Sequence, residues 1–320
     1  GAHASIGSVL PFFARTVACG VYDIAEADFF DTSVVTNTVP VGAYRGAGRP
    51  EAAAAIERMI DRFAAEVEMD PAEVRRINFI KPDAFPFTTP TGANMDSGEY
   101  SAALQAVMDH VDYPGLRAEQ ERRRNDPSAA LMGLGWSAYV EIANPMGNAE
   151  FGSIEVRPDG SAVVLTGSSA HGQGHHTAFA QVASDATGIL FEKIEVRHGD
   201  TDEVLRGGGT GGSKSLQVGG SAVLQASEAA VVLAKDLAAS LLEANPADVE
   251  LDPNTGTFAV AGTPAINVSW AEVATKAEEQ QGTNLLATAD FDPGAPTFPF
   301  GAHLSVVEVD RDTGDVTVLR

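Results

Sequence analysis

The stretch Gly172-Gln173-Gly174-His175-His176-Thr177 decides how the rest of the chain is interpreted. It follows residues 162–167, which predict a strand, and it begins a helical pattern over residues 177–187. A glycine turn between strand and helix aims free backbone N–H groups and the positive end of a helix dipole at an anion. Glycine lets a ligand approach the main chain, and the Gln173 amide can both donate and accept hydrogen bonds. Taken alone, such a loop is more often a turn without a ligand.

Two further loops share this design. Residues 198–202 lead into Gly207-Gly208-Gly209-Thr210-Gly211-Gly212-Ser213-Lys214-Ser215, which precedes a long Ala-rich helical stretch. Upstream, Ala43-Tyr44-Arg45-Gly46-Ala47-Gly48-Arg49-Pro50-Glu51 again leads from glycines into a helix. Three loops of one kind predict a large polyphosphorylated or polycyclic ligand that is held from several sides.

The composition excludes several classes of function. The 320 residues include 21 Lys and Arg against 44 Asp and Glu, a formal net charge of −23 spread along the chain, which argues against nucleic acid or an anionic membrane as partner. Cys19 is the only cysteine, so it forms no internal disulfide, and we expect it to be buried and inert. The sequence has no uninterrupted apolar run long enough to predict a membrane span and no signal peptide, and it begins as if cut from a longer protein.

Three kinds of catalytic site are also disfavoured. His171, His175 and His176 are close in sequence, but adjacent helical residues do not face one metal, so a zinc site held by the protein is not expected. The Gly-x-Ser-x-Gly turn of a serine hydrolase is absent, and residues 212–215 break the order of a Walker phosphate loop. The residues alone favour a bound anionic cofactor and identify no nucleophile.

The hydrophobic pattern predicts an α+β protein with mixed sheets, packed helices and two lobes, residues 1–126 and 127–320. In the first lobe, helices are expected over residues 51–68, from an Asp70 N-cap to 76 and after an Asp96-Ser97 cap. A charged helix or linker is expected over 116–124, and a strand over 29–39. The second lobe is expected to begin with strands and a hairpin turning at Asp159-Gly160. Further on, we expect a long helix within 216–244, a helix capped by Ser269, an irregular segment over 283–300 and a last hairpin over 303–320.

The three loops, in this order, resemble the molybdenum-binding large subunit of the xanthine oxidase and aldehyde oxidase family. The nearest likeness is to bacterial members called carbon monoxide dehydrogenase large chains. Residues 36–40 (Thr-Asn-Thr-Val-Pro) and 75–80 (Arg-Arg-Ile-Asn-Phe-Ile) belong to the same likeness, which covers nearly the whole chain. It implies that the two lobes are molybdenum-cofactor-binding lobes, the first partial and the second incomplete at its C-terminal end.

The resemblance implies a molybdopterin cofactor, as the cytosine dinucleotide, whose dithiolene holds the molybdenum, so no protein residue is a metal ligand. Gln173 and Gly174 would contact the pterin, with His175 and His176 in the same loop. Ser213 and Ser215, after Thr210, would bind the pyrophosphate or cytidine side. Gly211 and Gly212 would lie beside the metal, while Arg45 and Gly46 would shape the floor of the pocket.

Each residue also has a plainer interpretation. Ser213 and Ser215 could be helix caps, and Arg45 could form an internal salt bridge. His175 and His176 are expected to pack or to support other groups rather than to react, and Lys214 is expected to face solvent. Gln173 is the residue that we expect most firmly to contact the cofactor.

The chain departs from the family pattern at two places. Molybdenum–copper carbon monoxide dehydrogenases carry a copper-binding cysteine, a serine and a phenylalanine in the Arg45 loop, where this chain has Gly46, Ala47 and Gly48. Xanthine and aldehyde oxidases have a substrate-clamping phenylalanine at the position of Ala47. The family's catalytic base, a glutamate in a Gly-x-Gly-Glu motif, has no counterpart in these residues, so no catalytic residue is assigned.

The resemblance therefore implies the cofactor-binding part of a cytoplasmic molybdenum hydroxylase. Such an enzyme hydroxylates an aldehyde or N-heterocycle with oxygen from water and passes the electrons to [2Fe–2S] and FAD. The implied partners are an iron–sulfur small subunit, an FAD-binding medium subunit and the rest of the large subunit, in a dimer of heterotrimers. The alternatives are a fragment or split subunit that only binds the cofactor, an acidic domain whose glycine loops are structural, and a carbon monoxide dehydrogenase-like chain.

Overall fold

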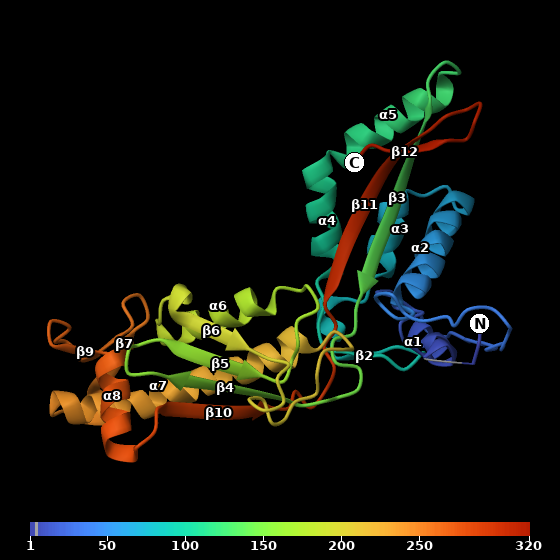
Figure 1. Ribbon diagram of the computed structural model, residues 1–320. Coiled ribbons are helices and arrows are strands. Elements are labelled where there is room, and N and C mark those ends of the chain that lie inside the picture. Colours follow the sequence, from blue (N-terminus) through green and yellow to red (C-terminus); the bar gives the residue numbers. More distant parts are fainter. Residues whose placement is uncertain (4–5) are drawn as a thin grey trace. The chain divides into compact units, whose positions relative to one another are not determined.

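The computed structural model describes residues 1–3 and 6–320, which form two compact units. Unit 1 holds Gly1–Ile142 with Thr297–Arg320, and unit 2 holds Ala143–Pro296. Both mix helices with sheets, which confirms the α+β class (Figure 1). The units differ from the lobes expected to meet at residue 126, because strand β3 (Leu131–Val140) pairs along its whole length with β11 (Phe300–Val309). The division into two cofactor-binding lobes at residue 126 stays a prediction.

Unit 1 is built on an antiparallel sheet in the order β12-β11-β3, with α2, α4 and α5 packed on β3 and β11. Two short strands, β1 and β2, form an antiparallel pair. The remaining elements of the unit are α1 (Leu10–Thr16), α2 (Arg49–Glu66), α3 (Pro71–Asn78), α4 (Tyr100–Val111), α5 (Tyr113–Asn125), β1 (Phe87–Thr88), β2 (Asn94–Met95), β12 (Val316–Val318) and the short 3-10 turns Gly7–Val9 and Pro82–Ala84.

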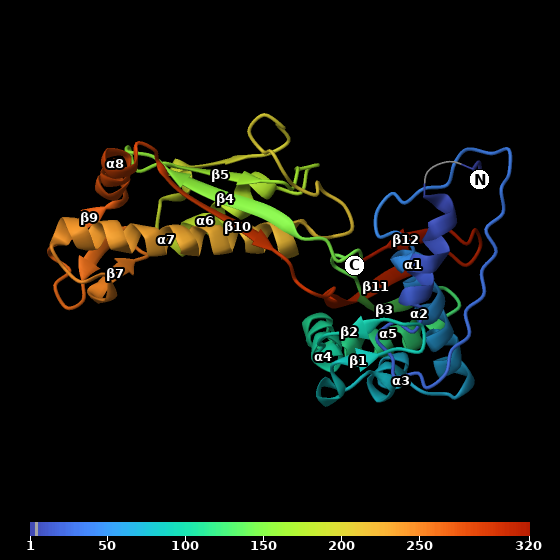
Figure 2. The same cartoon turned by 90° about the horizontal axis from the view of Figure 1, so that it is seen from below.

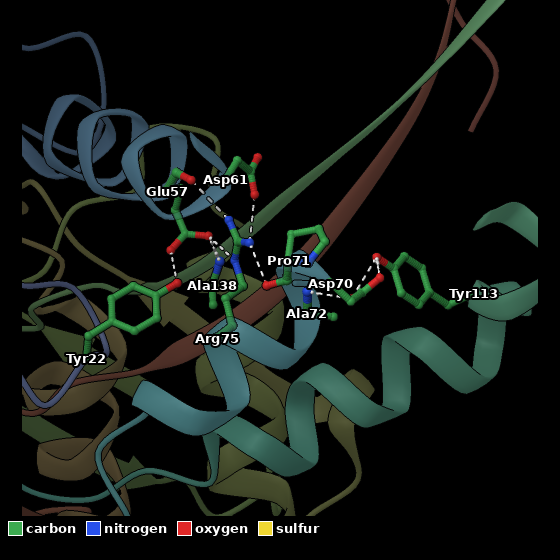
Figure 3. A network of polar contacts seen from close by, with 9 residues as sticks. All are labelled: Tyr22, Glu57, Asp61, Asp70, Pro71, Ala72, Arg75, Tyr113 and Ala138. Carbon is green, nitrogen blue, oxygen red and sulfur yellow. Dashed lines mark hydrogen bonds and ion pairs between the residues drawn. The ribbon is translucent and has the colours of Figure 1, made fainter. Parts of the chain in front are cut away.

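A buried polar network joins α2, α3 and β3 in the core of unit 1 (Figure 3). The Arg75 guanidinium is fully buried, and its Nε donates to Glu57 Oε2 at 3.0 Å. Glu57 also accepts from the backbone N–H of Ala138 on β3, at 2.8 Å, and from the Tyr22 hydroxyl. Burial raises the pKa of Tyr22, so its hydroxyl stays protonated and remains a donor. Glu57 of α2 thus contacts both Arg75 of α3 and the backbone of β3.

Two expectations for unit 1 are wrong. Residues 29–39 form no strand, and Phe30 is 90% exposed. Their side chains favour a strand, but no other strand among the described residues pairs with this segment. Asp96 does not cap α4, which begins at Tyr100 with no side-chain cap; its carboxylate accepts instead from the backbone N–H of Phe298, at 2.9 Å. The expected Asp70 cap of α3 is confirmed, since Asp70 accepts from the N–H of Ala72 at 2.8 Å.

Unit 2 is built on a mixed sheet in the order β10-β4-β5-β6, in which only the β5–β6 pair is parallel. Figure 2 shows α6 and α7 on the same face of this sheet. A second small sheet, β7-β8-β9, and α8 pack at the C-terminal end of α7. The elements are β4 (Glu150–Val156), β5 (Ala162–Thr166), α6 (His175–Thr187), β6 (Ile194–Arg197), α7 (Ser221–Leu242), β7 (Val249–Asp252), β8 (Thr257–Val260), β9 (Asn267–Ser269), α8 (Trp270–Gln281), β10 (Leu285–Phe291), the 3-10 turns Phe191–Lys193 and Pro246–Asp248, and a π-helical segment, Ser215–Gly220.

Small residues let α7 approach the sheet closely. Ala222, Ala226, Ala230 and Ala234 recur every fourth position and are fully buried. Gly152 on β4 faces the start of this row, where an added Cβ would lie 2.7 Å from the backbone of α7. The continuous helical stretch Ser215–Leu242 is long and apolar enough to cross a membrane, but its buried alanine row identifies it as a core helix of unit 2.

The expectations for unit 2 are mostly confirmed. The hairpin turning at Asp159-Gly160 pairs β4 with β5, and Ser269 caps α8 in a capping box with Glu272. The irregular segment expected over residues 283–300 is wrong in part, because Leu285–Phe291 forms β10, an antiparallel neighbour of β4. Its partner strand, β4, lies far upstream in the sequence, so no local sequence pattern predicts the pairing.

Candidate functional site

The Gln173 loop joins β5 to α6 and leaves the start of α6 open. Gly172 and Gly174 adopt φ angles of +100° and +80°, and a Cβ on either would meet nothing within 4 Å. Gly174 is the N-cap of α6 and supplies no side-chain hydrogen bond, so the first N–H groups of this 13-residue helix have no side-chain cap. The Gln173 side-chain oxygen accepts from the backbone N–H of His171, which holds the amide within the loop.

The second loop, residues 207–215, is bent at several residues with positive φ. Ser213 adopts a φ of +59°, which is uncommon for a residue other than glycine, and Gly212 has +67°. A Cβ on Gly211 would meet nothing within 4 Å, so open space lies beside this residue. Ser215 is buried at the start of the π-helical segment, a geometry that is frequent at functional sites.

The structure brings the two loops of unit 2 together. The Thr210 hydroxyl donates to the backbone oxygen of Ser169 at 2.5 Å and lies 3.1 Å from the Ser215 hydroxyl oxygen. The backbone N–H of Gly209 donates to the oxygen of Gly167 at 3.1 Å. Segment 167–169 leads directly into the Gln173 loop. These bonds therefore hold the start of the Gln173 loop against loop 207–215.

The predicted histidines begin α6 rather than lie in the loop before it. His175 is only 6% exposed, and its ring stacks on Phe179 with centroids 5.1 Å apart. Burial and the neighbouring His198 lower the pKa of His175, so the ring is neutral at pH 7. His176 is exposed, and its ring centroid lies 4.6 Å from that of His198, whose pKa burial also lowers.

Two side chains beside these loops have buried polar atoms without hydrogen-bond partners. Among the described residues, nothing bonds to His175 Nδ1, and nothing bonds to either the Nε2 or the Oε1 of Gln217 in the π-helical segment. Buried polar atoms are nearly always paired, so these atoms are available to a ligand. Gln217 was not predicted from the sequence, where it is one more residue of a helical pattern.

Lys214 does not face solvent as expected. Its side chain is only 3% exposed, and its ammonium lies 3.4 Å from Oε2 of Glu150, which is also buried. The sequence gives no sign of this pair, because the partners are 64 residues apart.

Arg45 and Gly46 lie in unit 1, before α2. Arg45 is exposed and forms no ion pair within residues 1–3 and 6–320. Arg49 is instead the buried arginine of this loop, with Nε 3.0 Å from Glu141 Oε1, and its backbone N–H donates to the Gly46 oxygen at 3.1 Å. The part that Arg45 and Gly46 take in a site stays a prediction.

A small hollow of about 220 Å³ adjoins the two loops of unit 2, and it is lined by Gly167, Ser169, Gly199, Asp200, Thr201, Val204, Arg206 and Gly207. A hollow of about 380 Å³ is lined in part by Glu150, Gly207 and Gly208, while the hollows of about 450 and 520 Å³ at the N-terminal segment and over β7–β9 contain no candidate residue. In the part of the chain that the structure describes, no three His, Cys, Asp or Glu side chains are grouped to hold a metal ion. The loops offer hydrogen-bonding groups and backbone dipoles to a ligand.

Comparison with known proteins gives this geometry a context. Two family models, both described as molybdopterin cofactor-binding domain, match residues 1–79 and 106–320. The carbon monoxide dehydrogenase large chain of Hydrogenophaga pseudoflava is 41% identical over 95% of this chain and 40% of its own length. The nicotine 6-hydroxylase large subunit of Paenarthrobacter nicotinovorans is 32% identical over 95% of this chain and 39% of its own. The chain thus spans about 40% of the length of these curated relatives.

Solved structures agree with the sequence relatives. A Cu,Mo-CO dehydrogenase superposes with a TM-score of 0.84 at 32% identity, over 96% of this chain and 41% of the other. Quinoline 2-oxidoreductase from Pseudomonas putida 86 gives 0.83 at 29% identity, over 98% and 41%. These matches confirm the resemblance drawn from the three loops. The chain belongs to the xanthine oxidase family and consists of its molybdopterin cofactor-binding domains.

Proposed function

We propose that this chain holds the molybdopterin cofactor of a molybdenum hydroxylase and grips it with the two loops of unit 2. The observation that carries the proposal is the joining of these loops through Thr210, which bonds to Ser169 and lies against Ser215. Gln173, Gly174, His175 and His176 contribute from one loop, and Thr210, Gly211, Gly212, Ser213 and Ser215 from the other. The role that the resemblance implies for Arg45 and Gly46 stays a separate prediction.

The residues present suit such a cofactor. A pterin presents alternating donors and acceptors, and the unpartnered His175 Nδ1 and Gln217 amide offer both kinds of atom. The open start of α6 favours a negatively charged group, such as a pyrophosphate. The open space beside Gly172, Gly174 and Gly211 lets a large ligand reach the backbone.

When bound, the cofactor supplies two-electron oxidation chemistry with water as the source of oxygen. The chain's own residues bind and orient it. Thr210 and Ser215 fix the second loop, and the neutral His175 ring keeps a positive charge away from the start of α6. The base expected from the Gly-x-Gly-Glu motif is not among these 320 residues, so a catalytic carboxylate would come from elsewhere in the enzyme.

For the substrate we propose an aldehyde or an N-heterocycle. The names of nicotine 6-hydroxylase and quinoline 2-oxidoreductase support the heterocycle. A carbon monoxide dehydrogenase is the second candidate, favoured by the 41% identity to such a large chain. It is opposed by Gly46, Ala47 and Gly48, because the cysteine to which copper would bind is absent from them. The cytosine dinucleotide form, [2Fe–2S] and FAD subunits and a cytoplasmic location belong to the same proposal.

Replacing Gln173 tests the assignment of the loops. In the complete large chain purified from its own host, Gln173→Ala should lower the pterin and molybdenum content per chain and leave the melting temperature unchanged, because Gln173 is exposed. Gln181→Ala, at an exposed position on α6, is the matched control and should keep the wild-type content. Unchanged cofactor content in Gln173→Ala would refute the role of this loop.

A further inference from the structure

Glu150 is a buried carboxylate at the point where the two loops of unit 2 meet. It is only 2% exposed and begins β4. The backbone N–H of Gly208 donates to its Oε1 and Oε2 at 3.1 and 3.2 Å, and the Ser168 hydroxyl donates to Oε2 at 3.4 Å. The Lys214 ammonium supplies the compensating charge, also at 3.4 Å. A buried charge is tolerated when it is paired and hydrogen-bonded in this way.

Three glycines next to this carboxylate leave no room for a side chain of their own. A Cβ on Gly167 would lie 2.2 Å from Glu150 Oε1, and one on Gly207 would lie 2.3 Å from the Cα of Gly167. A Cβ on Gly208 would lie 2.3 Å from the Lys214 ammonium. The backbone of both loops is therefore closed around the Glu150–Lys214 pair, and Gly208 covers the ammonium.

The pair lies between the two segments that carry the cofactor residues. Gly167 and Ser168 precede the Gln173 loop, and Gly208 and Lys214 flank Thr210, Gly211 and Gly212 in the other loop. Removing either charge would leave the other charge buried and unpaired between the two segments. Their spacing would then change, together with the bonds from Gly209 and Thr210 to segment 167–169.

A lysine in a glycine-rich loop is commonly read as a ligand of phosphate. Here the geometry points to another role. We propose that Glu150 and Lys214 are a positioning pair that sets the spacing of the two cofactor loops, and that Lys214 is the counter-ion of Glu150 and does not contact the cofactor. This inference rests on the proposed function, because it assigns the pair to the same site.

A double-mutant cycle separates the two roles of Lys214. In the complete large chain from its own host, Lys214→Met and Glu150→Gln should each lower the pterin content of folded protein roughly tenfold, since each leaves a buried group uncompensated. Each should also lower the melting temperature by about 10 °C. Glu150→Gln/Lys214→Met should recover much of both losses, because neither charge remains. Lys193→Met, at an exposed position next to β6, is the matched control and should resemble the wild type.

Pterin content is measured on the folded fraction at 4 °C, so that it reports loop spacing separately from unfolding. If the double variant loses as much pterin as Lys214→Met, Lys214 contacts the cofactor and the inference is wrong. It is equally wrong if Glu150→Gln alone keeps both pterin content and melting temperature. A wild-type protein without pterin would overturn the proposed function instead, and coupling between the two variants in melting temperature would then still report whether the pair locks the loops.

Discussion

His175 is the residue at which the candidate site and the solvent pH are most directly linked. Its ring is buried at the first position of α6, where burial and the neighbouring His198, His171 and His176 lower its pKa. As the pH falls below about 6.5, the unfolded chain protonates this imidazole, while the folded protein keeps it neutral to a lower pH. The free energy of unfolding therefore has its full value above this window and falls as the pH drops through it.

Replacing the ring with one that does not titrate should remove this dependence. In His175→Phe the stacking on Phe179 can remain, so we expect the wild type to lose stability relative to the variant between pH 7.5 and 5.5, by at most about 1.4 kcal/mol per pH unit. The measurement is chemical denaturation at several pH values. His110→Phe is the control, because this exposed ring of α4 lies in water in both states. A stability difference between wild type and His175→Phe that stays constant over this range would contradict the expectation.

For single residues, the sequence pattern predicted which residues lie in the loops, but not which buried side chains lie next to the loops. Gln173, Thr210 and Ser215 belong to a pattern that could be seen in the chain, and Thr210 and Ser215 do lie together. Lys214 was misplaced because its burial depends on Glu150, a residue brought to it by tertiary folding. Gln217 was missed because nothing in a sequence distinguishes an unpaired buried amide from a paired one.

Among the elements, α3 depends most clearly on a single side chain. Arg75 is fully buried and bonds to Glu57 and to Asp61, with Nη1 2.7 Å from the Asp61 carboxylate. The next residue, Arg76, is 54% exposed and pairs with Glu73 on the same helix. Replacing each of these two adjacent arginines therefore compares the stability contribution of a buried network with that of a surface ion pair.

Arg75→Met should destabilise the protein by about 3–5 kcal/mol, because Glu57 is left buried without its charge partner. Arg76→Met should cost less than about 1 kcal/mol, as expected of an exposed pair. Denaturant unfolding followed by circular dichroism measures both. Equal losses in the two variants would show that the network does not hold α3 and α2 on the sheet.

Elements were predictable where the signal was local. The cap of α3, the capping box of α8 and the turn of the β4–β5 hairpin each depend on a few neighbouring residues, and all are confirmed. The strand expected over residues 29–39 failed because β-favouring residues form a strand only when a partner is present. Strand β10 was not predicted because its own sequence has no clear strand pattern. It forms a strand because it pairs with β4.

For the whole molecule, family membership was predictable because three loops in fixed order are a more specific signal than any one of them. The division into units was not, because β11 returns from the C-terminal segment to complete the sheet of unit 1. A net charge of −23 is compatible with a cofactor site whose anion-binding groups are backbone N–H groups and hydroxyls rather than a cluster of cations.

The most direct test of the account is the pterin and molybdenum content of the wild-type protein, purified from its own host with the chains that accompany it. Because the loops of unit 2 are proposed to hold the cofactor, we expect close to one pterin and one molybdenum for each copy of this chain. An intact native complex that contains neither would contradict the central claim, and the three loops would then be evidence of common ancestry alone.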